Sequence, residues 1–312
     1  MAAQCNIPML RNKSVVSIND IGDDELSEIF KTAEDMEKAL KSGKPLELMK
    51  GKIMATFFYE PSTRTRLSFE SAMQRLGGSV ISVPEAKSSS VAKGETLADT
   101  VRMAEGYSDI IVIRHPMEGA ARLASRFTSK PIVNAGDGSG QHPTQTVLDL
   151  YTIRKELGGI SGKTVTIVGD LRYGRTVHSL VLALSRFNAR VNLVAPPILK
   201  MPDHVVSMLP ADFKLNITEN LSDVLPETDV LYVTRIQKER FSDPNEYQSV
   251  IGSYKINSET VAAMKEKSII MHPLPRVDEI SPDVDSSPKA AYFRQANNGV
   301  PVRMAIISLI LG

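Results

Sequence analysis

The sequence has one cysteine, no tryptophan and no surplus of either charge. Its 312 residues include 37 Lys plus Arg against 36 Asp plus Glu, a formal net charge of +1. The single cysteine, Cys5, cannot form an internal disulfide or a cysteine-rich zinc site, which fits a reducing compartment. Charge balance argues against a surface built for nucleic acid or anionic lipid, because such surfaces carry a basic surplus. Small molecules are therefore the expected partners.

Long hydrophobic runs are absent as well. Residues 1–14 lack the apolar stretch of about 7 to 15 residues that a secretory signal requires, and no window reaches the ~18 apolar residues of a membrane span. We therefore expect a soluble, cytoplasmic protein with no membrane or nucleic-acid partner. The length, with 42% hydrophobic residues, allows two domains that each bury a core.

Helix-like and strand-like segments alternate in the first half of the chain. Residues 23–40 carry apolar side chains at spacings of three and four, which predicts a helix with one buried face. The residues of that face are Leu26, Ile29, Phe30, Ala33 and Met36. Strands are predicted at 52–59, 109–115 and 130–138, and helices at 68–78, 98–107 and 142–159.

A second series of the same kind follows. Strands are predicted at 161–170, 189–196, 228–235 and 267–273. Two runs of alternating strands and helices imply an α/β protein of two domains, each a parallel sheet flanked by helices.

We expect the domains to divide within the long helix around 143–158, which would act as a hinge. The first domain is placed at 1–145 plus 294–312, and the second at 146–293. The C-terminal segment 300–312 predicts an amphipathic helix that must dock on a domain or on a partner subunit.

Unusual polar residues follow several predicted strands, at the strand ends where open parallel sheets bind ligands. Ser62–Arg66 lies between a strand and a helix, where hydroxyls, backbone N–H groups and the helix dipole favour an anion. Arg64 and Arg66 can grip phosphate oxygens in a bidentate fashion, so the segment predicts a phosphate site. The competing interpretation is a capped helix start with solvated arginines.

Two more clusters come from the first domain. Arg114 and His115 close a strand, and the competing interpretation there is a structural histidine beside a surface arginine. His142 and Gln145 stand at a helix start. His142 can donate to a substrate carbonyl and Gln145 offers a donor and an acceptor, although a plain helix cap is the alternative.

The second domain contributes three clusters. Gly169–Thr176 joins a strand to a helix without the spacing of the GxGxxG dinucleotide fingerprint, and Arg175 within it suits a carboxylate. Arg235 and Gln237 follow another strand. Segment 272–276 contains two prolines that fix the backbone and leave carbonyls for a ligand amine or amide. Because no Ser/His/Asp set, metal-ligand spacing or paired carboxylates compete, we expect chemistry by orientation and electrostatics.

In combination these motifs resemble the aspartate carbamoyltransferases. In chain order they are STRTR, RHP, QHPTQ, GDLRYGRTVHS, TRIQKER and HPLPRVDEI. STRTR and HPTQ resemble transcarbamoylases in general. TRIQKER and HPLPR are more specific. At these places the pattern of ornithine carbamoyltransferases has a Ser-Met-Gly segment and a His-Cys-Leu-Pro segment, and both are absent from this sequence. The N-terminal fifty residues carry little of the likeness.

The resemblance implies a transcarbamoylase-like fold with a Rossmann-like second domain, and transfer of a carbamoyl group from carbamoyl phosphate to L-aspartate in pyrimidine synthesis. It implies that carbamoyl phosphate is bound by Ser62, Thr63, Arg64, Thr65, Arg114, His142, Gln145, Pro273 and Leu274. It implies that aspartate is bound by Lys93, Arg175, Arg235 and Gln237. Among these, the implied catalytic residues are Arg64, Thr65, Arg114, His142 and Gln145.

The likeness also implies a homotrimer with shared active sites, in which a neighbouring subunit supplies Ser89 and Lys93. It implies no metal and no organic cofactor, since the leaving phosphate can accept the amine proton. Whether regulatory chains bind stays open.

Two other functions stay open beside this one. A transcarbamoylase for ornithine would want an acidic lining, whereas Arg235 and Lys238 favour an acidic acceptor. A non-catalytic anion-binding or scaffold subunit would bind phosphate without turnover, and the presence of Thr65, Arg114 and His142 argues against it.

Overall fold

The computed structural model describes residues 8–85 and 90–312, so that Cys5 and Ser89 lie outside the described residues. The chain divides into two compact units. Unit 1 runs up to Val147 and includes Asn298–Gly312, and unit 2 is Leu148–Asn297. Two helices, α5 (Pro143–Leu157) and α11 (Tyr292–Leu311), contain the points where the chain passes from one unit to the other.

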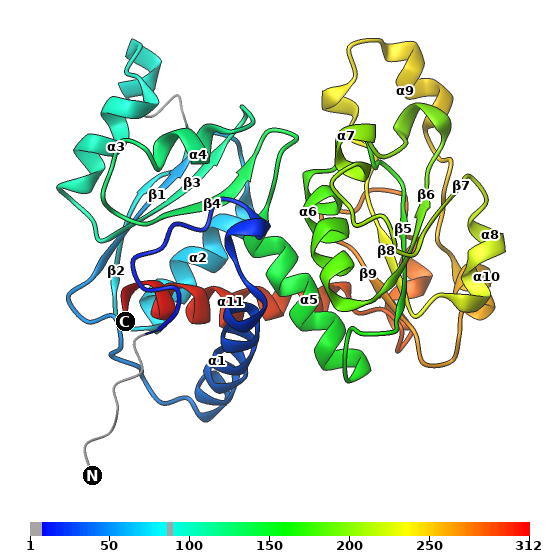
Figure 1. Cartoon of the computed structure of the whole chain (residues 1–312), viewed down its shortest axis with the longest axis horizontal. Coiled ribbons are helices and arrows are strands. Elements are labelled where there is room, and N and C mark those ends of the chain that lie inside the picture. The colour runs from blue at the N-terminus through cyan, green and yellow to red at the C-terminus, as the bar shows by residue number, and fades with distance from the viewer. Residues whose placement is uncertain (1–7, 86–89) are drawn as a thin grey trace. The chain divides into compact units, whose positions relative to one another are not determined.

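Unit 1 is a four-stranded parallel sheet with helices on both of its faces (Figure 1). The strand order is β2-β1-β3-β4. The strands are β1 (Ile53–Phe58), β2 (Ser79–Val83), β3 (Ile110–His115) and β4 (Ile132–Asp137). Its helices, besides parts of α5 and α11, are α1 (Asp23–Ser42), α2 (Thr63–Arg75), α3 (Leu97–Glu105) and α4 (Ala120–Ala124). Strand β4 is buried along its whole length, as expected for a parallel sheet covered on both faces.

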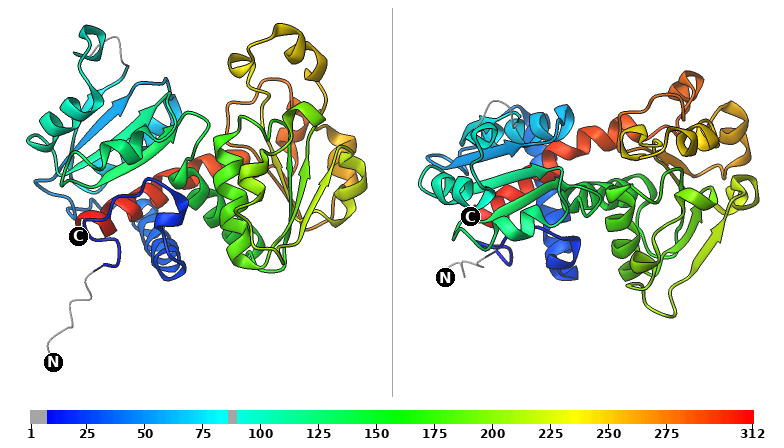
Figure 2. Two further views of the ribbon diagram at one scale, coloured as in Figure 1. Left: turned by 45° about the horizontal axis from the view of Figure 1, so that its top comes forward. Right: turned by 90° about the horizontal axis from the view of Figure 1, so that it is seen from above.

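Unit 2 is a five-stranded parallel sheet in the order β7-β6-β5-β8-β9, which is the doubly wound Rossmann arrangement. The strands are β5 (Thr164–Val168), β6 (Arg190–Val194), β7 (Leu215–Thr218), β8 (Val230–Val233) and β9 (Ile269–Met271). The helices are α6 (Arg175–Leu184), α7 (Asp203–Val206), α8 (Leu221–Val224), α9 (Pro244–Val250) and α10 (Ser258–Ala263). Figure 2 shows α6 and α10 on opposite sides of this sheet.

Short 3-10 helices join these elements in both units. They are η1 (Ile18–Asp20), η3 (Ser90–Lys93), η4 (Ser185–Phe187), η5 (Pro197–Leu199), η6 (Leu225–Glu227), η7 (Lys238–Arg240) and η8 (Pro282–Ser286). None of the helices in the described part of the chain combines the length and hydropathy of a membrane span.

The two predicted parallel sheets are confirmed, and α1 buries the five apolar residues expected of it. The prediction missed β2 and β7, each of which is one of the two edge strands of its sheet. Both carry mostly exposed or half-buried side chains, so their sequences lack the continuous apolar run that marks the central strands.

Two helices are longer than predicted. Helix α2 begins at Thr63, several residues before its first buried apolar residue Phe69, because its first turn is polar and only Thr65 in it is buried. Helix α11 begins at Tyr292 and runs through Pro301. The C-terminal part of α11 is buried on nearly every side rather than along one stripe, since even Arg303 is only 3% exposed. Dense packing holds α11 together across the backbone hydrogen bond that a proline removes.

Candidate active site

The carboxyl edge of the unit 1 sheet brings three of the predicted clusters to one side. Phe58 of β1 pairs with Arg114 of β3, and His115 of β3 pairs with Asp137 of β4. Because these strands are parallel neighbours, the segments that follow them leave the sheet at the same edge. STRTR follows β1, RHP closes β3, and QHPTQ follows β4.

The STRTR segment forms the N-terminal turn of α2, with Ser62 as N-cap residue. The Ser62 side chain makes no capping hydrogen bond, so the plain capped helix start is not what the structure has. An α-helix leaves its first backbone N–H groups without internal partners, which together with the dipole favours an anion here. Partial desolvation lowers the pKa of the Arg64 guanidinium. Arg66 lies 3.9 Å from Glu70 within the helix, and its phosphate role stays a prediction.

Arg114 is a half-buried, anchored cation, so its interpretation as a surface arginine is wrong. Its side chain is 12% exposed; Nη1 donates to the Ala135 carbonyl at 3.2 Å and Nη2 to Glu60 Oε1 at 3.1 Å. Two fixed donors orient the guanidinium plane at the sheet edge. The neighbouring His115 accepts from the Met117 N–H at 3.0 Å, and burial lowers the pKa of its imidazole.

His142 and Gln145 lie at the start of α5, 3% and 9% exposed respectively. The preceding loop is fixed by Asp137, whose Oδ1 accepts from the Gln141 N–H at 3.0 Å. The Gln141 side chain in turn accepts from the Ser17 hydroxyl and the Ile18 N–H, both at 2.9 Å. The N-terminal fifty residues, to which the sequence assigned nothing, therefore hold the His142 loop in place.

The unit 2 sheet repeats the same principle at its own carboxyl edge. Val168 of β5 pairs with Val233 of β8, and Tyr232 pairs with Met271 of β9, so the segments after these strands leave together. Gly169 has a φ of +119°, and a Cβ there would lie 2.4 Å from the Thr234 carbonyl oxygen. Only glycine lets the chains after β5 and β8 approach this closely.

Asp170 ties the GDLRYGRT segment to the TRIQKER segment. It is fully buried, and its carboxylate accepts from the Tyr173 N–H at 2.9 Å and from the Gln237 N–H at 3.2 Å. Gln237 Nε2 also donates to the Tyr173 carbonyl at 3.0 Å. Burial raises the pKa of Asp170, while these N–H donors partly offset the rise. Arg175, the first residue of α6, is 8% exposed on the same segment.

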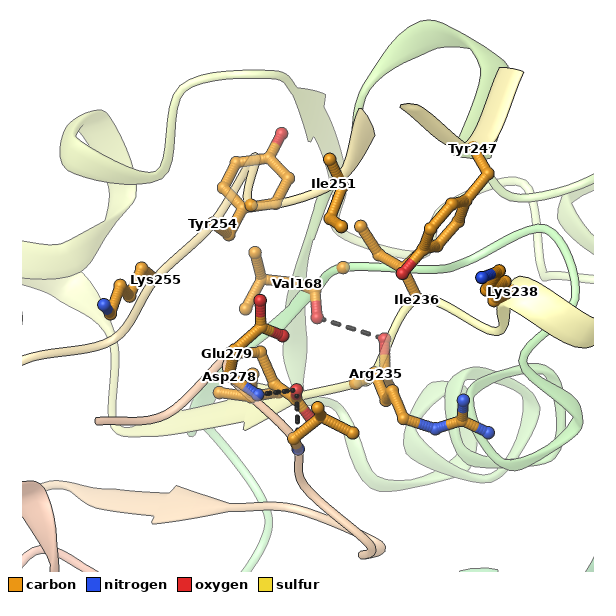
Figure 3. Close-up of a pocket in the computed structure, with 15 residues that line it drawn as sticks. Val168, Arg235, Ile236, Lys238, Tyr247, Ile251, Tyr254, Lys255, Asp278 and Glu279 are labelled. Atoms are coloured by element: carbon orange, nitrogen blue, oxygen red, sulfur yellow. Dashed lines mark hydrogen bonds between the residues drawn. The ribbon is translucent and has the colours of Figure 1, made fainter. Parts of the chain in front are cut away.

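Arg235 is paired with Glu239 through two hydrogen bonds, of 3.0 Å from Nη1 and 2.5 Å from Nη2. The hydrogen bond to Glu239 raises the pKa of the Arg235 guanidinium. A cavity of about 280 Å³ adjoins this arginine and lies entirely within unit 2 (Figure 3). Lys238 and Lys255 also line it, and so do Asp278 and Glu279, so the lining has both signs of charge with a surplus of one cation.

The remaining predicted residues lie after β9 and around η3. Pro273 and Leu274 follow β9, and Leu274 has a φ of +56°, which is uncommon for a residue other than glycine. Lys93 is exposed at the end of η3. Ser89, its predicted companion, lies outside the described residues.

Sequence reasoning missed the carboxylates that hold the cations and loops. Glu60, Asp170 and Glu239 each lie within or beside a motif that was singled out, yet only their bonds show what they do. The sequence feature that could have pointed to them is an acidic residue in or next to a segment that follows a strand and is otherwise rich in cations.

Comparison with known proteins matches almost the whole chain. Residues 13–155 match the family described as aspartate/ornithine carbamoyltransferase, carbamoyl-P binding domain, and residues 161–310 match the corresponding Asp/Orn binding domain. The aspartate carbamoyltransferase catalytic subunit of Thermoplasma volcanium is 72% identical over 304 residues, which cover 97% of this chain and all of the relative. That of Methanocaldococcus jannaschii is 59% identical, covering 96% and 98%.

Solved structures give the same result. Aspartate transcarbamoylase from Trypanosoma cruzi in complex with carbamoyl phosphate and aspartate is 42% identical, with a TM-score of 0.94 and coverage of 98% of this chain and 99% of that one. The same enzyme in complex with carbamoyl aspartate and phosphate has a TM-score of 0.93, 42% identity and full coverage of both chains. With its two sheets, their motif-bearing edges and these relatives, the chain belongs to the aspartate/ornithine carbamoyltransferase family, among the aspartate carbamoyltransferase catalytic subunits.

Proposed function

We propose that this chain transfers the carbamoyl group of carbamoyl phosphate to the amine of L-aspartate, giving N-carbamoyl-L-aspartate and phosphate, as a step of pyrimidine synthesis. The observation that carries the choice of acceptor is Arg235, a guanidinium just after the end of β8 that lines a cavity in unit 2. An acceptor carboxylate can pair with this guanidinium, whereas a cationic acceptor side chain cannot.

Unit 1 supplies the groups for carbamoyl phosphate. The N-terminal turn of α2, with Ser62, Thr63, Arg64 and Thr65, binds the phosphate, because backbone N–H groups and Arg64 favour a dianion there. Arg114, Thr65 and His142 donate to the carbamoyl oxygen. The burial of these donors strengthens each hydrogen bond to the negative charge that develops on that oxygen.

Unit 2 supplies the groups for the acceptor. Arg175, Arg235 and Gln237 bind the aspartate carboxylates, and the carbonyls of Pro273 and Leu274 accept from the carbamoyl nitrogen with help from Gln145. The amine attacks the carbonyl carbon, a C–N bond forms, and the tetrahedral intermediate carries an oxyanion. When the bond from carbon to the phosphate oxygen breaks, the departing phosphate takes the amine proton.

The direct test offers carbamoyl phosphate together with aspartate or ornithine and measures each carbamoylated product. We expect carbamoyl aspartate only. Turnover of ornithine alone would overturn the acceptor, and phosphate binding without any turnover would favour a non-catalytic subunit.

A matched pair of histidine variants shows that the activity belongs to this chain. His142→Ala should lower the rate by about 100-fold or more, because a buried donor to the oxyanion is lost. His204→Ala, which changes an exposed histidine on α7, should keep the wild-type rate. Equal rates for the two variants would contradict the role of His142.

We also infer a homotrimer in which a neighbouring subunit contributes Ser89 and Lys93. The support is the family likeness of the segment around them and the exposure of Lys93. Mixing inactive Lys93→Ala with inactive Arg64→Ala should recover activity, because a hybrid trimer contains sites with both residues intact. Subunit exchange verified by native mass spectrometry with no recovery would count against shared sites.

Location and assembly complete the proposal. One cysteine in 312 residues fits the reducing cytoplasm, where we place the enzyme. The mass of the assembly isolated from its native source decides whether the trimer acts alone or with regulatory chains.

A further inference from the structure

The loop that follows β9 is closed by one buried carboxylate. Glu279 Oε1 lies 2.7 Å from His272 Nε2 at the start of the loop. Glu279 Oε2 accepts from the Val277 N–H at 3.0 Å and the Asp278 N–H at 3.1 Å at its end. His272 is 1% exposed and Glu279 8% exposed, so water does not compete effectively for these bonds.

The geometry also fixes the tautomer of His272. The Leu274 N–H points at His272 Nδ1 over 2.7 Å, and a backbone amide can only donate. Nδ1 must therefore be the bare acceptor nitrogen, which leaves the proton on Nε2, where it is donated to Glu279. The hydrogen bond to Glu279 and the hydrogen bond from Leu274 therefore require the same tautomer of His272.

A second set of buried bonds anchors the His272 backbone. The His272 N–H donates to Gln295 Oε1 at 2.8 Å, and Gln295 Nε2 donates to Asp149 Oδ1 at 2.7 Å. The Tyr232 hydroxyl donates to Asp149 Oδ2 at 2.7 Å. Gln295, Asp149 and Tyr232 are all at most 1% exposed, so the start of the loop is rigidly attached to β8, α5 and α11.

Between these anchors lie the two carbonyls that the proposed function uses. Within the described residues, neither the Pro273 nor the Leu274 carbonyl accepts a hydrogen bond from the protein. Leu274 is also held at a φ of +56°, a conformation that persists only where surrounding contacts determine it. The bond from Leu274 N–H to His272 is the one contact that fixes this amide directly.

We propose that Glu279 and His272 are a positioning pair for the reaction, Glu279 holding the His272 tautomer that orients the Pro273–Leu274 carbonyls toward the carbamoyl nitrogen. This inference rests on the proposed function for the role of the carbonyls. Glu279 also lines the cavity beside Arg235. The positioning role runs through the backbone between the two residues.

Glu279→Gln is the diagnostic variant because it keeps the shape of the side chain. The native carboxylate accepts at both oxygens, whereas a carboxamide has one oxygen and one NH₂ group. If the NH₂ group faces His272, the imidazole must carry its proton on Nδ1, where it would face the Leu274 N–H donor. If the NH₂ group faces Val277 and Asp278, it would face their two backbone N–H donors.

The control is Thr166→Val in the same sheet. Thr166 Oγ1 lies 2.6 Å from Thr228 Oγ1 and both residues are fully buried, so this variant also loses a buried hydrogen bond in unit 2. We expect Glu279→Gln to lower kcat by about tenfold to hundredfold, because small displacements of orienting groups have that effect. Phosphate affinity should stay within about twofold. Thr166→Val should leave kcat unchanged, even when its unfolding midpoint falls by as much as that of Glu279→Gln. Equal kcat for the two variants would overturn the proposal.

Nitrogen NMR of ¹⁵N-histidine-labelled wild type tests the pair without turnover. His272, identified by its loss in His272→Asn, should show a bare Nδ1 and a protonated Nε2 at the pH of activity. A proton on Nδ1 would overturn the inference even if Glu279→Gln fails to fold. If the wild type does not carbamoylate aspartate, the proposed function fails, and the tautomer measurement still decides whether the pair exists.

Discussion

Replacing Arg235 by alanine should separate the two substrates. Arg235 holds Glu239 through two hydrogen bonds in this structure, and its side chain is 27% exposed. In the proposed function, aspartate therefore takes this guanidinium from Glu239 or shares it. The binding free energy lost in the variant is that of the Arg235 pair with a substrate carboxylate, minus that of the pair that Arg235 already makes with Glu239.

The magnitude follows from those two terms. Two charge-assisted hydrogen bonds to a carboxylate contribute about 3 kcal/mol. Glu239 is 55% exposed, so its own pair with Arg235 contributes at most about 1 kcal/mol. The net loss is about 2 to 3 kcal/mol, which corresponds to roughly a 30- to 150-fold fall in kcat/KM for aspartate.

The assay varies aspartate at saturating carbamoyl phosphate, and separately titrates inorganic phosphate by calorimetry. Phosphate affinity should be unchanged in Arg235→Ala. Glu239→Gln is the matched control: it removes the competing charge, so KM for aspartate should be unchanged or lower by up to about fivefold. An equal loss for aspartate and phosphate in Arg235→Ala would refute the division of labour between the two units.

Two further predictions concern stability. The hydrogen bond from Arg276 lowers the pKa of Asp285, so this pair stabilises the fold above the ordinary Asp pKa of about 3.9 and loses that effect as pH falls through the lowered value. Asp285→Asn should flatten the fall in melting temperature below about pH 4, and a curve parallel to wild type from pH 5 to 3 would contradict this. Gly169→Ala should lower the free energy of unfolding by about 1–3 kcal/mol or more, since φ is +119° and Thr234 blocks the Cβ, as urea titration can check. Gly159→Ala, with open space around its Cβ, is the control that should stay within about 0.5 kcal/mol.

Where sequence reasoning succeeded, local side-chain patterns carried the information. The stripe of α1 and the apolar runs of β3 and β5 report burial directly, because a residue's periodicity reflects which face of its own element meets the core. The same patterns failed for β2 and β7, because their side chains are exposed or half-buried and form no continuous apolar run. The start of α2 was misplaced because its first turn is polar, so no apolar periodicity marks it.

The sequence alone determined two parallel α/β sheets, the family likeness, and which strand ends carry the polar motifs. Only the tertiary structure decided how those motifs are held. Arg114 meets Glu60 across 54 positions of the chain, and the Asp170 carboxylate meets the Gln237 amide across 67. Such pairings depend on which strands become neighbours in a sheet. No local spacing encodes them, and they became visible only once β1 lay beside β3 and β5 beside β8.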